Sequence, residues 1–139
     1  MEETEFISKT PSDTWDAGEY IGRNAKKGEL YILKGELGAG KTQLVKGIAR
    51  GIGVAEWEYV VSPSFTLMNI YEGDGFDLCH VDLYRIDEAE AEELQIEEFL
   101  ERGIVVVEWS EKKTWHAGAI TVEIEVTGEY ERRIMIKKP

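Results

Sequence analysis

The chain has 139 residues, of which 42% are hydrophobic and 32% are charged, as expected for one globular domain spanning residues 1–139. Acidic residues outnumber basic ones by 28 to 16, and the net charge of −12 argues against strong direct binding of nucleic acid. No apolar run is long enough to span a membrane and the first residues are acidic, so we expect a cytoplasmic location. Cys79 is the single cysteine, which excludes an intrachain disulfide.

The first elements that the sequence predicts are a short edge strand and a helix. The strand covers Thr4 to Ser8. The run Pro11-Ser12-Asp13-Thr14 is typical of a helix start, with Ser, Asp or Thr as the N-cap. Gly18 and Gly22 weaken this helix, because glycine disfavours a helix interior. An apolar stripe at four-residue spacing supports the helix and consists of Ala17, Ile21 and Ala25.

The strongest signal is the run from Gly35 to Thr42, GELGAGKT, which fits the pattern of Gly, four residues and Gly-Lys-Thr. Its glycines let the backbone turn so that N–H groups surround phosphate oxygens, while Lys41 reaches the phosphates and the Thr42 hydroxyl binds Mg²⁺. A strand-like apolar run precedes the motif at 29–33, and a helical pattern follows it at 42–50. Strand, loop and helix are the context that this motif requires, so we predict a nucleotide phosphate site.

The middle of the chain is expected to form an antiparallel hairpin. Residues 57–61 are expected to be extended, and a polar turn at 62–67 leads into a strand that runs through Tyr71. The turn signal Gly73-Asp74-Gly75 separates this strand from a second one at 76–84.

The last third of the chain predicts a helix, a central strand and a terminal hairpin. Residues 87–100 are expected to form one helix capped by Asp87, whose many carboxylates make either a solvated face or a docking surface. The β-branched run at 104–107 is typical of a strand that is covered on both faces. Alternating residues at 121–126 and a strand at 133–136 predict a hairpin.

Two carboxylates are candidates for the chemistry that a bound nucleotide needs. Glu108 ends the apolar run at 104–107, and Asp82 ends the preceding strand. A carboxylate that emerges from a buried strand is seldom there for stability, because its desolvation is unfavourable. In phosphate-loop folds such a residue lies near the Mg²⁺ or orients the attacking group.

Two further polar residues lie near these carboxylates in the sequence. Thr66 belongs to the hydroxyl-rich run at 62–66, which is either a switch-like loop over the terminal phosphate or a plain turn. His80 shares a strand face with Asp82 and is a base, a phosphate partner or a structural residue. His116 is the second of two histidines, and this number does not support a zinc site.

Four motifs together resemble the TsaE (YjeE) family, the P-loop ATPases of bacterial tRNA threonylcarbamoyladenosine biosynthesis. They are GELGAGKT at 35–42, SPSFTL at 62–67, HVDLYR at 80–85 and VEW at 107–109, and their order and spacing match along essentially the whole chain. The resemblance implies an α/β, P-loop NTPase-like fold of three layers with a central mixed sheet and antiparallel hairpins. It also implies ATP and Mg²⁺ as cofactors, ATPase activity that is weak in isolation, and the proteins TsaD and TsaB as partners.

The resemblance assigns roles to individual residues. Lys41, Asp82 and Thr66 are the expected catalytic residues, and Asp82 is expected to orient or activate water. Thr42 and Glu108 are expected to hold Mg²⁺. The expected nucleotide-binding residues are Thr14, Gly35, Leu37, Gly38, Ala39, Gly40, Lys41, Thr42, Gln43 and Arg133.

Two other functions fit the phosphate-binding motif and remain open at the level of sequence. One is a P-loop small-molecule kinase, although residues after Glu108 contain no lid-like insertion rich in arginine. The other is a nucleotide-dependent interaction module that binds ATP with negligible hydrolysis. Hydrolysis by an Asp82 variant separates the ATPase from the interaction module.

Overall fold

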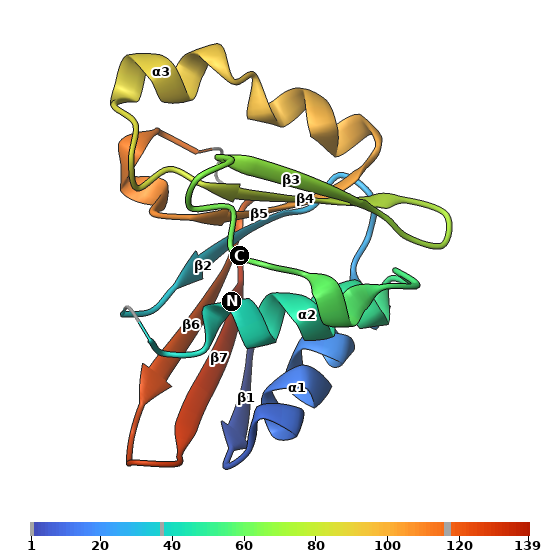
Figure 1. The fold of residues 1–139 in the computed structure, drawn as a ribbon, viewed down its shortest axis with the longest axis vertical. Helices are drawn as coiled ribbons and strands as arrows, with labels where there is room; N and C mark the ends of the chain where they lie inside the picture. Colours follow the sequence, from blue (N-terminus) through green and yellow to red (C-terminus); the bar gives the residue numbers. More distant parts are fainter. Residues whose placement is uncertain (1, 37, 116–117) are drawn as a thin grey trace.

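A computed structural model describes residues 2–36, 38–115 and 118–139. These residues form a seven-stranded mixed sheet with the order β1-β7-β6-β2-β5-β4-β3. Figure 1 shows this sheet between α3 on one side and α1 and α2 on the other. The α/β fold with a central mixed sheet, predicted from the sequence, is therefore confirmed.

The elements alternate along much of the chain, as in other α/β folds. The strands are β1 (Glu2–Ser8), β2 (Leu30–Lys34), β3 (Met68–Glu72), β4 (Asp77–Asp82), β5 (Gly103–Glu108), β6 (Ile120–Val126) and β7 (Arg132–Lys138). The α-helices are α1 (Pro11–Asn24), α2 (Lys41–Gly51) and α3 (Glu88–Glu93). The 3₁₀ helices are η1 (Trp57–Tyr59), η2 (Ile96–Glu101) and η3 (Ser110–Lys112). None of the helices in the described part of the chain is long and apolar enough to cross a membrane.

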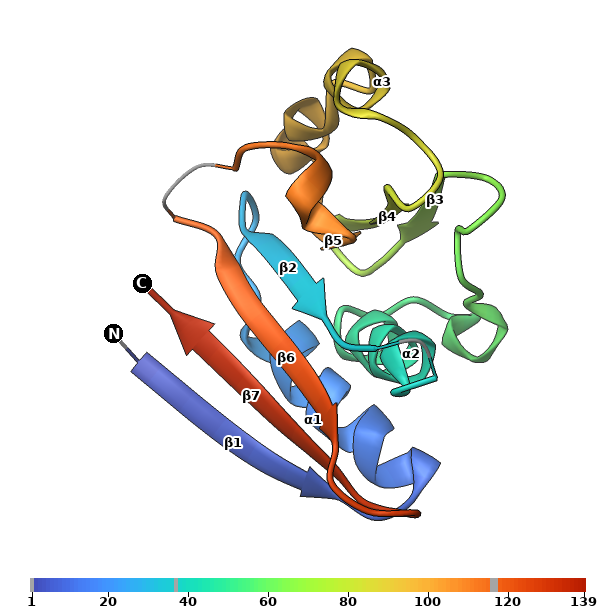
Figure 2. The same ribbon diagram turned by 90° about the vertical axis from the view of Figure 1, so that its left-hand side faces the viewer.

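Strands β6, β2, β5 and β4 form the parallel centre of the sheet, and every residue of β5 is buried. This confirms the prediction that the run at 104–107 is a central strand. The two predicted hairpins are also present, as the antiparallel pairs β3–β4 and β6–β7. Strand β1 pairs with β7 at one edge, which brings the two chain termini together, as Figure 2 shows.

Alternating residues of the central strands face two separate cores. Tyr31 and Val106 belong to the core that α1 and α2 cover, whereas Val105 and Val107 belong to the core beneath α3 and η2. Successive side chains of a strand point to opposite faces, so a sheet with helices on both sides has apolar residues throughout. This arrangement confirms the three layers.

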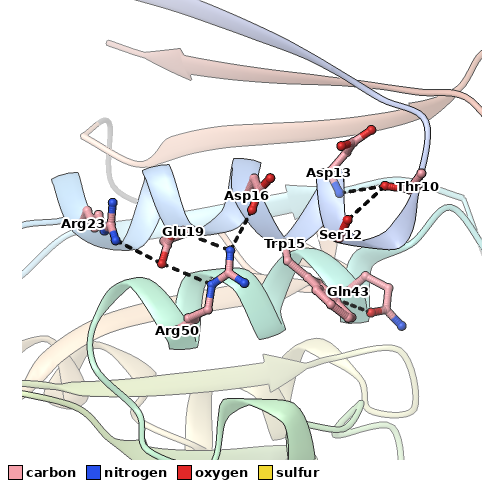
Figure 3. A network of polar contacts seen from close by, with 9 residues as sticks. All are labelled: Thr10, Ser12, Asp13, Trp15, Asp16, Glu19, Arg23, Gln43 and Arg50. Atoms are coloured by element: carbon pink, nitrogen blue, oxygen red, sulfur yellow. Dashed lines mark hydrogen bonds and ion pairs between the residues drawn. The ribbon is translucent and has the colours of Figure 1, made fainter.

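Helices α1 and α2 approach closely because glycines face each other at their contact. A Cβ at Gly18 would collide with the backbone of α2, and a Cβ at Gly47 would collide with the backbone of α1. Figure 3 shows the polar contacts along the same interface, where Arg50 pairs with Asp16 and Glu19. The glycines that disfavour α1 as an isolated helix thus permit its packing on α2.

Three predictions about local structure are wrong: the N-cap of the first helix, the extended segment at 57–61 and the single helix at 87–100. The N-cap of α1 is Thr10, whose side chain accepts a hydrogen bond from the Asp13 amide, and the cap therefore lies before the predicted start. Residues 57–61 do not pair as a strand. They include η1 instead, because amides in this segment donate to carbonyls three residues earlier.

The predicted helix at 87–100 is two helices, α3 and η2. Gln95 adopts a left-handed backbone conformation with φ of 50° and separates them. Ala91 and Ile96 are both buried against the same sheet face. Their five-residue spacing would place them on different sides of one continuous α-helix, so the break lets both reach the core.

Candidate active site

The phosphate-binding loop joins β2 to α2, as the motif predicts. Gly38 and Gly40 have φ of 83° and 104°, a left-handed conformation that glycine adopts without strain. Gly35 lies against Ile124 of β6 so closely that a Cβ would collide with its side chain. Leu37 lies outside the described residues. Glycine is therefore needed at Gly35 and Gly40, the two positions that the motif specifies, and also at Gly38 between them.

Helix α2 begins at Lys41 with features that favour an anion at its N-terminus. Its N-cap, Gly40, has no side chain to accept a hydrogen bond, and its first turn contains no acidic residue. The first amides of a helix lack intrahelical acceptors and carry partial positive charge. Thr42 and Gln43 follow Lys41 in the same turn. This end of α2 is therefore suited to phosphate oxygens.

The two candidate carboxylates lie side by side at the carboxyl-terminal ends of two neighbouring strands, next to this loop. Asp82 and Glu108 are register partners at the ends of the parallel strands β4 and β5. Their side chains are buried, with relative exposures of 5% and 4%. Two neighbouring acidic residues are thus held away from solvent beside a loop built for phosphate, an arrangement typical of a functional site.

Glu108 is surrounded by cationic and hydrogen-bonding partners. Its Oε1 lies 3.4 Å from Lys41 Nζ, and its Oε2 lies 2.6 Å from His80 Nε2. Burial by itself would raise the pKa of Glu108, but the hydrogen bond and charge of His80, together with Lys41, hold that pKa below its ordinary value. Glu108 is therefore kept as a carboxylate in the absence of any ligand.

His80 lies behind Glu108 and is fully buried. Its Nε2 contacts the carboxylate, while its Nδ1 has no hydrogen-bond partner among the described residues. A side chain with no exposed surface does not contact a ligand directly. Of the three roles considered from the sequence, the structure favours the structural one, in which His80 is a buried partner of Glu108.

Asp82 has neutral partners instead. Its Oδ1 accepts a hydrogen bond from the Tyr84 amide at 2.9 Å, and its Oδ2 accepts one from the Ser64 hydroxyl at 3.3 Å. Ser62 lies within hydrogen-bond distance of Ser64, so the hydroxyls of this loop form a short chain toward Asp82. The hydroxyl-rich loop therefore contacts the carboxylate at the end of β4 through Ser64.

Thr66 is not brought to the site. Its side chain is exposed and its hydroxyl donates to Asn69 Oδ1 at 2.7 Å. The reason lies in a tight turn, in which the Leu67 amide donates to the Pro63 carbonyl at 2.8 Å and Leu67 has φ of 68°. This turn directs Ser64 toward Asp82 and leaves Thr66 in solvent, so the hydroxyl that contacts Asp82 is that of Ser64 and not that of Thr66.

Trp109 covers the amine of the loop lysine. Its backbone is left-handed with φ of 59°, and its ring lies 5.1 Å from Lys41 Nζ and 4.7 Å from the Tyr84 ring. A cavity of about 240 Å³ lies beside it, between Gly35 and Glu111. Backbone strain of this kind concentrates at functional sites. Trp109 is therefore part of the site wall at the Lys41 end.

A second cavity, of about 220 Å³, opens at the other side of the loop and includes Thr14, which is buried. The Thr14 hydroxyl lies 2.6 Å from Ser8 Oγ. Gln43 lines the same cavity and accepts a hydrogen bond from the Trp15 indole at 2.6 Å, as Figure 3 shows. The other lining residues nearest the loop are Ala39, Gly40 and Arg132. The structure thus brings four of the expected nucleotide-binding residues to one cavity: Thr14, Ala39, Gly40 and Gln43.

Arg133 does not belong to this group. Its guanidinium pairs with Glu5 at 3.1 Å on the sheet face that points away from α1 and α2. Arg132, the preceding residue, lines the cavity, and its Nε donates to the Ala39 carbonyl at 3.0 Å. Neighbouring residues of a strand face opposite sides, so a one-residue difference decides which arginine reaches the loop. The structure therefore places Arg132 at the cavity beside the loop and Arg133 away from it.

The oxygen donors near the loop suit Mg²⁺. The Thr42 hydroxyl and the Glu108 carboxylate offer hard oxygen atoms, the kind of ligand that Mg²⁺ prefers. Glu108 Oε1 already has a cation beside it, the Lys41 amine. No cluster of three or more His, Cys, Asp or Glu side chains within the described ranges forms a complete metal site. Mg²⁺ at nucleotide sites commonly has one or two protein ligands and completes its shell with phosphates and water, so the residues fit this ion.

Residues 8–134 match the family model described as threonylcarbamoyl adenosine biosynthesis protein TsaE. The chain belongs to the TsaE family. Relatives from several bacteria carry the name tRNA threonylcarbamoyladenosine biosynthesis protein TsaE. The TsaE protein of Aquifex aeolicus is 39% identical over 132 residues, which cover 95% of this chain and 94% of that protein. The TsaE protein of Bacillus subtilis is 31% identical over 137 residues, covering 96% and 85% of the two chains.

A solved structure gives the same fold. The crystal structure of YdiB from Bacillus subtilis superposes with a TM-score of 0.76 and 26% identity, covering 99% of this chain and 86% of YdiB. The resemblance inferred from four short motifs is therefore confirmed at the level of family and fold. As a TsaE-family member, this chain takes part in the biosynthesis of the threonylcarbamoyladenosine modification of tRNA.

Proposed function

We propose that this TsaE-family chain is a cytoplasmic, Mg²⁺-dependent ATPase that supports threonylcarbamoyladenosine modification of tRNA. One observation carries the proposal. The phosphate-binding loop and two buried carboxylates, Asp82 and Glu108, converge at one edge of the sheet. A phosphate cradle, a cation-stabilised carboxylate and a second carboxylate are the parts that phosphoryl transfer to water requires.

Each residue at this edge has a distinct role in the proposal. Lys41 and the first amides of α2 bind the phosphates, and Thr42 and Glu108 hold Mg²⁺. When bound, the ion neutralises charge on the phosphates. Asp82 accepts a hydrogen bond from the attacking water, orients it and takes its proton as the bond from water oxygen to the terminal phosphorus forms and the bond to ADP breaks. Ser64 holds Asp82 in place through its hydrogen bond.

The cavity beside α1 is the proposed site for the nucleoside part of ATP. It lies on the other side of Gly40 from the carboxylates and contains the side chains of Thr14, Gln43 and Arg132. The glycine contact between α1 and α2 holds Thr14 next to the loop. This replaces Arg133 with Arg132 as the arginine proposed to lie near the nucleotide.

A protein partner is proposed to act on the same edge. Exposed apolar side chains are concentrated around the Ser62–Leu67 loop and strand β3. Surface apolar groups of this kind mark sites of protein association. The exposed apolar side chains around this loop and β3 are those of Tyr59, Val61, Phe65, Ile70 and Tyr84. We propose that TsaB and TsaD are the partners, that tRNA is not bound directly, and that hydrolysis in isolation is weak.

The test is the rate of ATP hydrolysis by the chain with and without a TsaB–TsaD complex. We expect ADP and inorganic phosphate as products, a requirement for Mg²⁺, and a faster rate when the complex is present. Transfer of phosphate to a metabolite without any effect of the complex would contradict the proposal and indicate a kinase. Tight ATP binding with no hydrolysis in either condition would contradict it in favour of an interaction module.

A further inference from the structure

The two oxygens of Glu108 have different partners, and this asymmetry leads to a further inference. Oε2 contacts a histidine ring that is fully buried in the core, whereas Oε1 contacts the end of a long lysine side chain. The first partner is fixed by packing and the second has rotatable bonds. One oxygen of the carboxylate is thus anchored while the other contacts a side chain that can move.

His80 is oriented by this single hydrogen bond. A carboxylate only accepts hydrogen bonds, so the proton of the contact resides on Nε2. The Nδ1 atom has no partner in the described part of the chain. Since a buried polar atom without a partner is unfavourable, apolar packing alone would not select histidine at this position. The contact with Glu108 is the feature of the site that needs this residue.

Lys41 is the group that a nucleotide would draw away. Its amine contacts Glu108 Oε1 in the free protein, and phosphate oxygens compete for the same amine. Movement of Lys41 toward phosphate would leave Oε1 without its cation inside a buried site. A Mg²⁺ ion that arrives with the phosphates restores that positive charge.

We propose that His80 is a positioning residue that anchors Glu108 through Oε2, so that Oε1 faces the cation and exchanges Lys41 for nucleotide-bound Mg²⁺. This inference rests on the proposed function. It states which oxygen is presented to the ion and which residue orients it. Partners that orient a metal-binding carboxylate contribute strongly to affinity, and their removal typically weakens metal binding by about 10–100-fold.

The test measures the Mg²⁺ concentration that gives half of the Mg²⁺-dependent gain in ADP affinity, with a fluorescent ADP derivative as the probe. His80→Phe keeps a buried ring but removes the donor. We expect it to need about 10–100-fold more Mg²⁺ than the unsubstituted protein, while its ADP affinity in EDTA is unchanged. His80→Gln can place an amide near the former Nε2 position, and we expect it to restore most of the lost response.

Two further variants separate positioning from folding. Cys79→Ala perturbs the neighbouring residue of β4, which is buried in the opposite core, and should leave the Mg²⁺ response unchanged. If His80→Phe does not fold, His80→Asn replaces it, because its shorter amide reaches the former Nδ1 position and does not reach Glu108. An unchanged Mg²⁺ response in a folded His80 variant without the Nε2 donor would overturn the inference. Absence of any Mg²⁺ effect in the unsubstituted protein would instead overturn the proposed function.

Discussion

The ends of strands β4 and β5 lie side by side, carry one carboxylate each, and surround them differently. Glu108 at the end of β5 contacts the Lys41 amine and the His80 ring. Asp82 at the end of β4 contacts a serine hydroxyl and a backbone amide. Their burial is almost equal, so the neighbours and not the depth distinguish them. Two carboxylates in different environments commonly take different chemical roles.

This difference indicates how the proposed site divides its work. The end of β5 is built to hold positive charge, which suits binding of phosphate and Mg²⁺. The end of β4 is attached to the Ser62–Leu67 loop, which suits a group that acts on water and responds to a partner. Substitutions at one strand end are therefore expected to remove its function and to leave the function of the other end intact.

The largest expected effect follows the substitution Lys41→Ala. It removes the amine that contacts phosphate in the proposed site and leaves the charge of Glu108 buried without that partner. We expect no detectable binding of ATP or ADP by calorimetry, together with a lower free energy of unfolding. Lys46→Ala on the same helix is the control, because Lys46 contacts the Glu58 carbonyl and not the site. Nucleotide affinity that survives Lys41→Ala would contradict the phosphate-binding role of the loop.

The substitution Asp82→Asn is expected to abolish hydrolysis while preserving binding. The amide cannot take a proton from water, and loss of a general base typically lowers a rate by about 10²–10⁴-fold. The measurement is single-turnover ATP hydrolysis in the presence of the partner proteins, with ADP affinity measured in parallel. Hydrolysis at the unsubstituted rate would remove Asp82 from the mechanism.

The acid stability of the protein tests the environment of Glu108. Because its pKa is lowered in the folded state, ionised Glu108 stabilises the fold at pH above its ordinary value of 4.5, and this contribution is lost as the pH falls through the folded value. We expect Glu108→Gln to have a lower free energy of unfolding than the unsubstituted protein at pH 7, and this difference to shrink in acid. Glu123→Gln is the control, because the carboxylate of Glu123 is partly exposed and pairs with Lys137 at 3.4 Å, away from the site. A difference that stays constant with pH would show that the carboxylate is not held ionised by its neighbours.

The smallest expected effect distinguishes two hydroxyls of one loop. Ser64→Ala removes the side-chain donor to Asp82, and we expect a hydrolysis rate that is lower by a few-fold, since one hydrogen bond contributes about 1 kcal/mol. Thr66→Ala removes an exposed hydroxyl that contacts Asn69, and we expect no change in rate. The reverse order of the two variants would favour the role that the sequence alone predicts for Thr66.

The sequence predicts those parts of the site that depend on local structure. The loop at 35–42 has a fixed pattern of glycines, and its conformation needs those glycines at the positions that the structure describes. Asp82 and Glu108 could be predicted because each ends a strand whose apolar residues indicate burial. The order of parallel strands then places both at the edge of the sheet where the loop lies.

Features that depend on tertiary contacts could not be predicted in the same way. The choice between Arg132 and Arg133 depends on which face of β7 points to the loop, and one residue reverses that face. The choice between Ser64 and Thr66 depends on the turn closed by Leu67 and Pro63. The contact between His80 and Glu108 joins residues 28 positions apart on neighbouring strands. No local pattern in the sequence encodes it.

The most direct test of the account is a comparison of ATP affinity with and without Mg²⁺ in two variants, Glu108→Gln and Asp82→Asn. Calorimetric titration measures both affinities in proteins that differ by one carboxylate at adjacent strand ends. We expect Glu108→Gln to lose most of the gain in affinity that Mg²⁺ provides, whereas Asp82→Asn keeps it. Equal loss of that gain in both variants, or its retention in Glu108→Gln, would contradict the division of roles between the two strand ends.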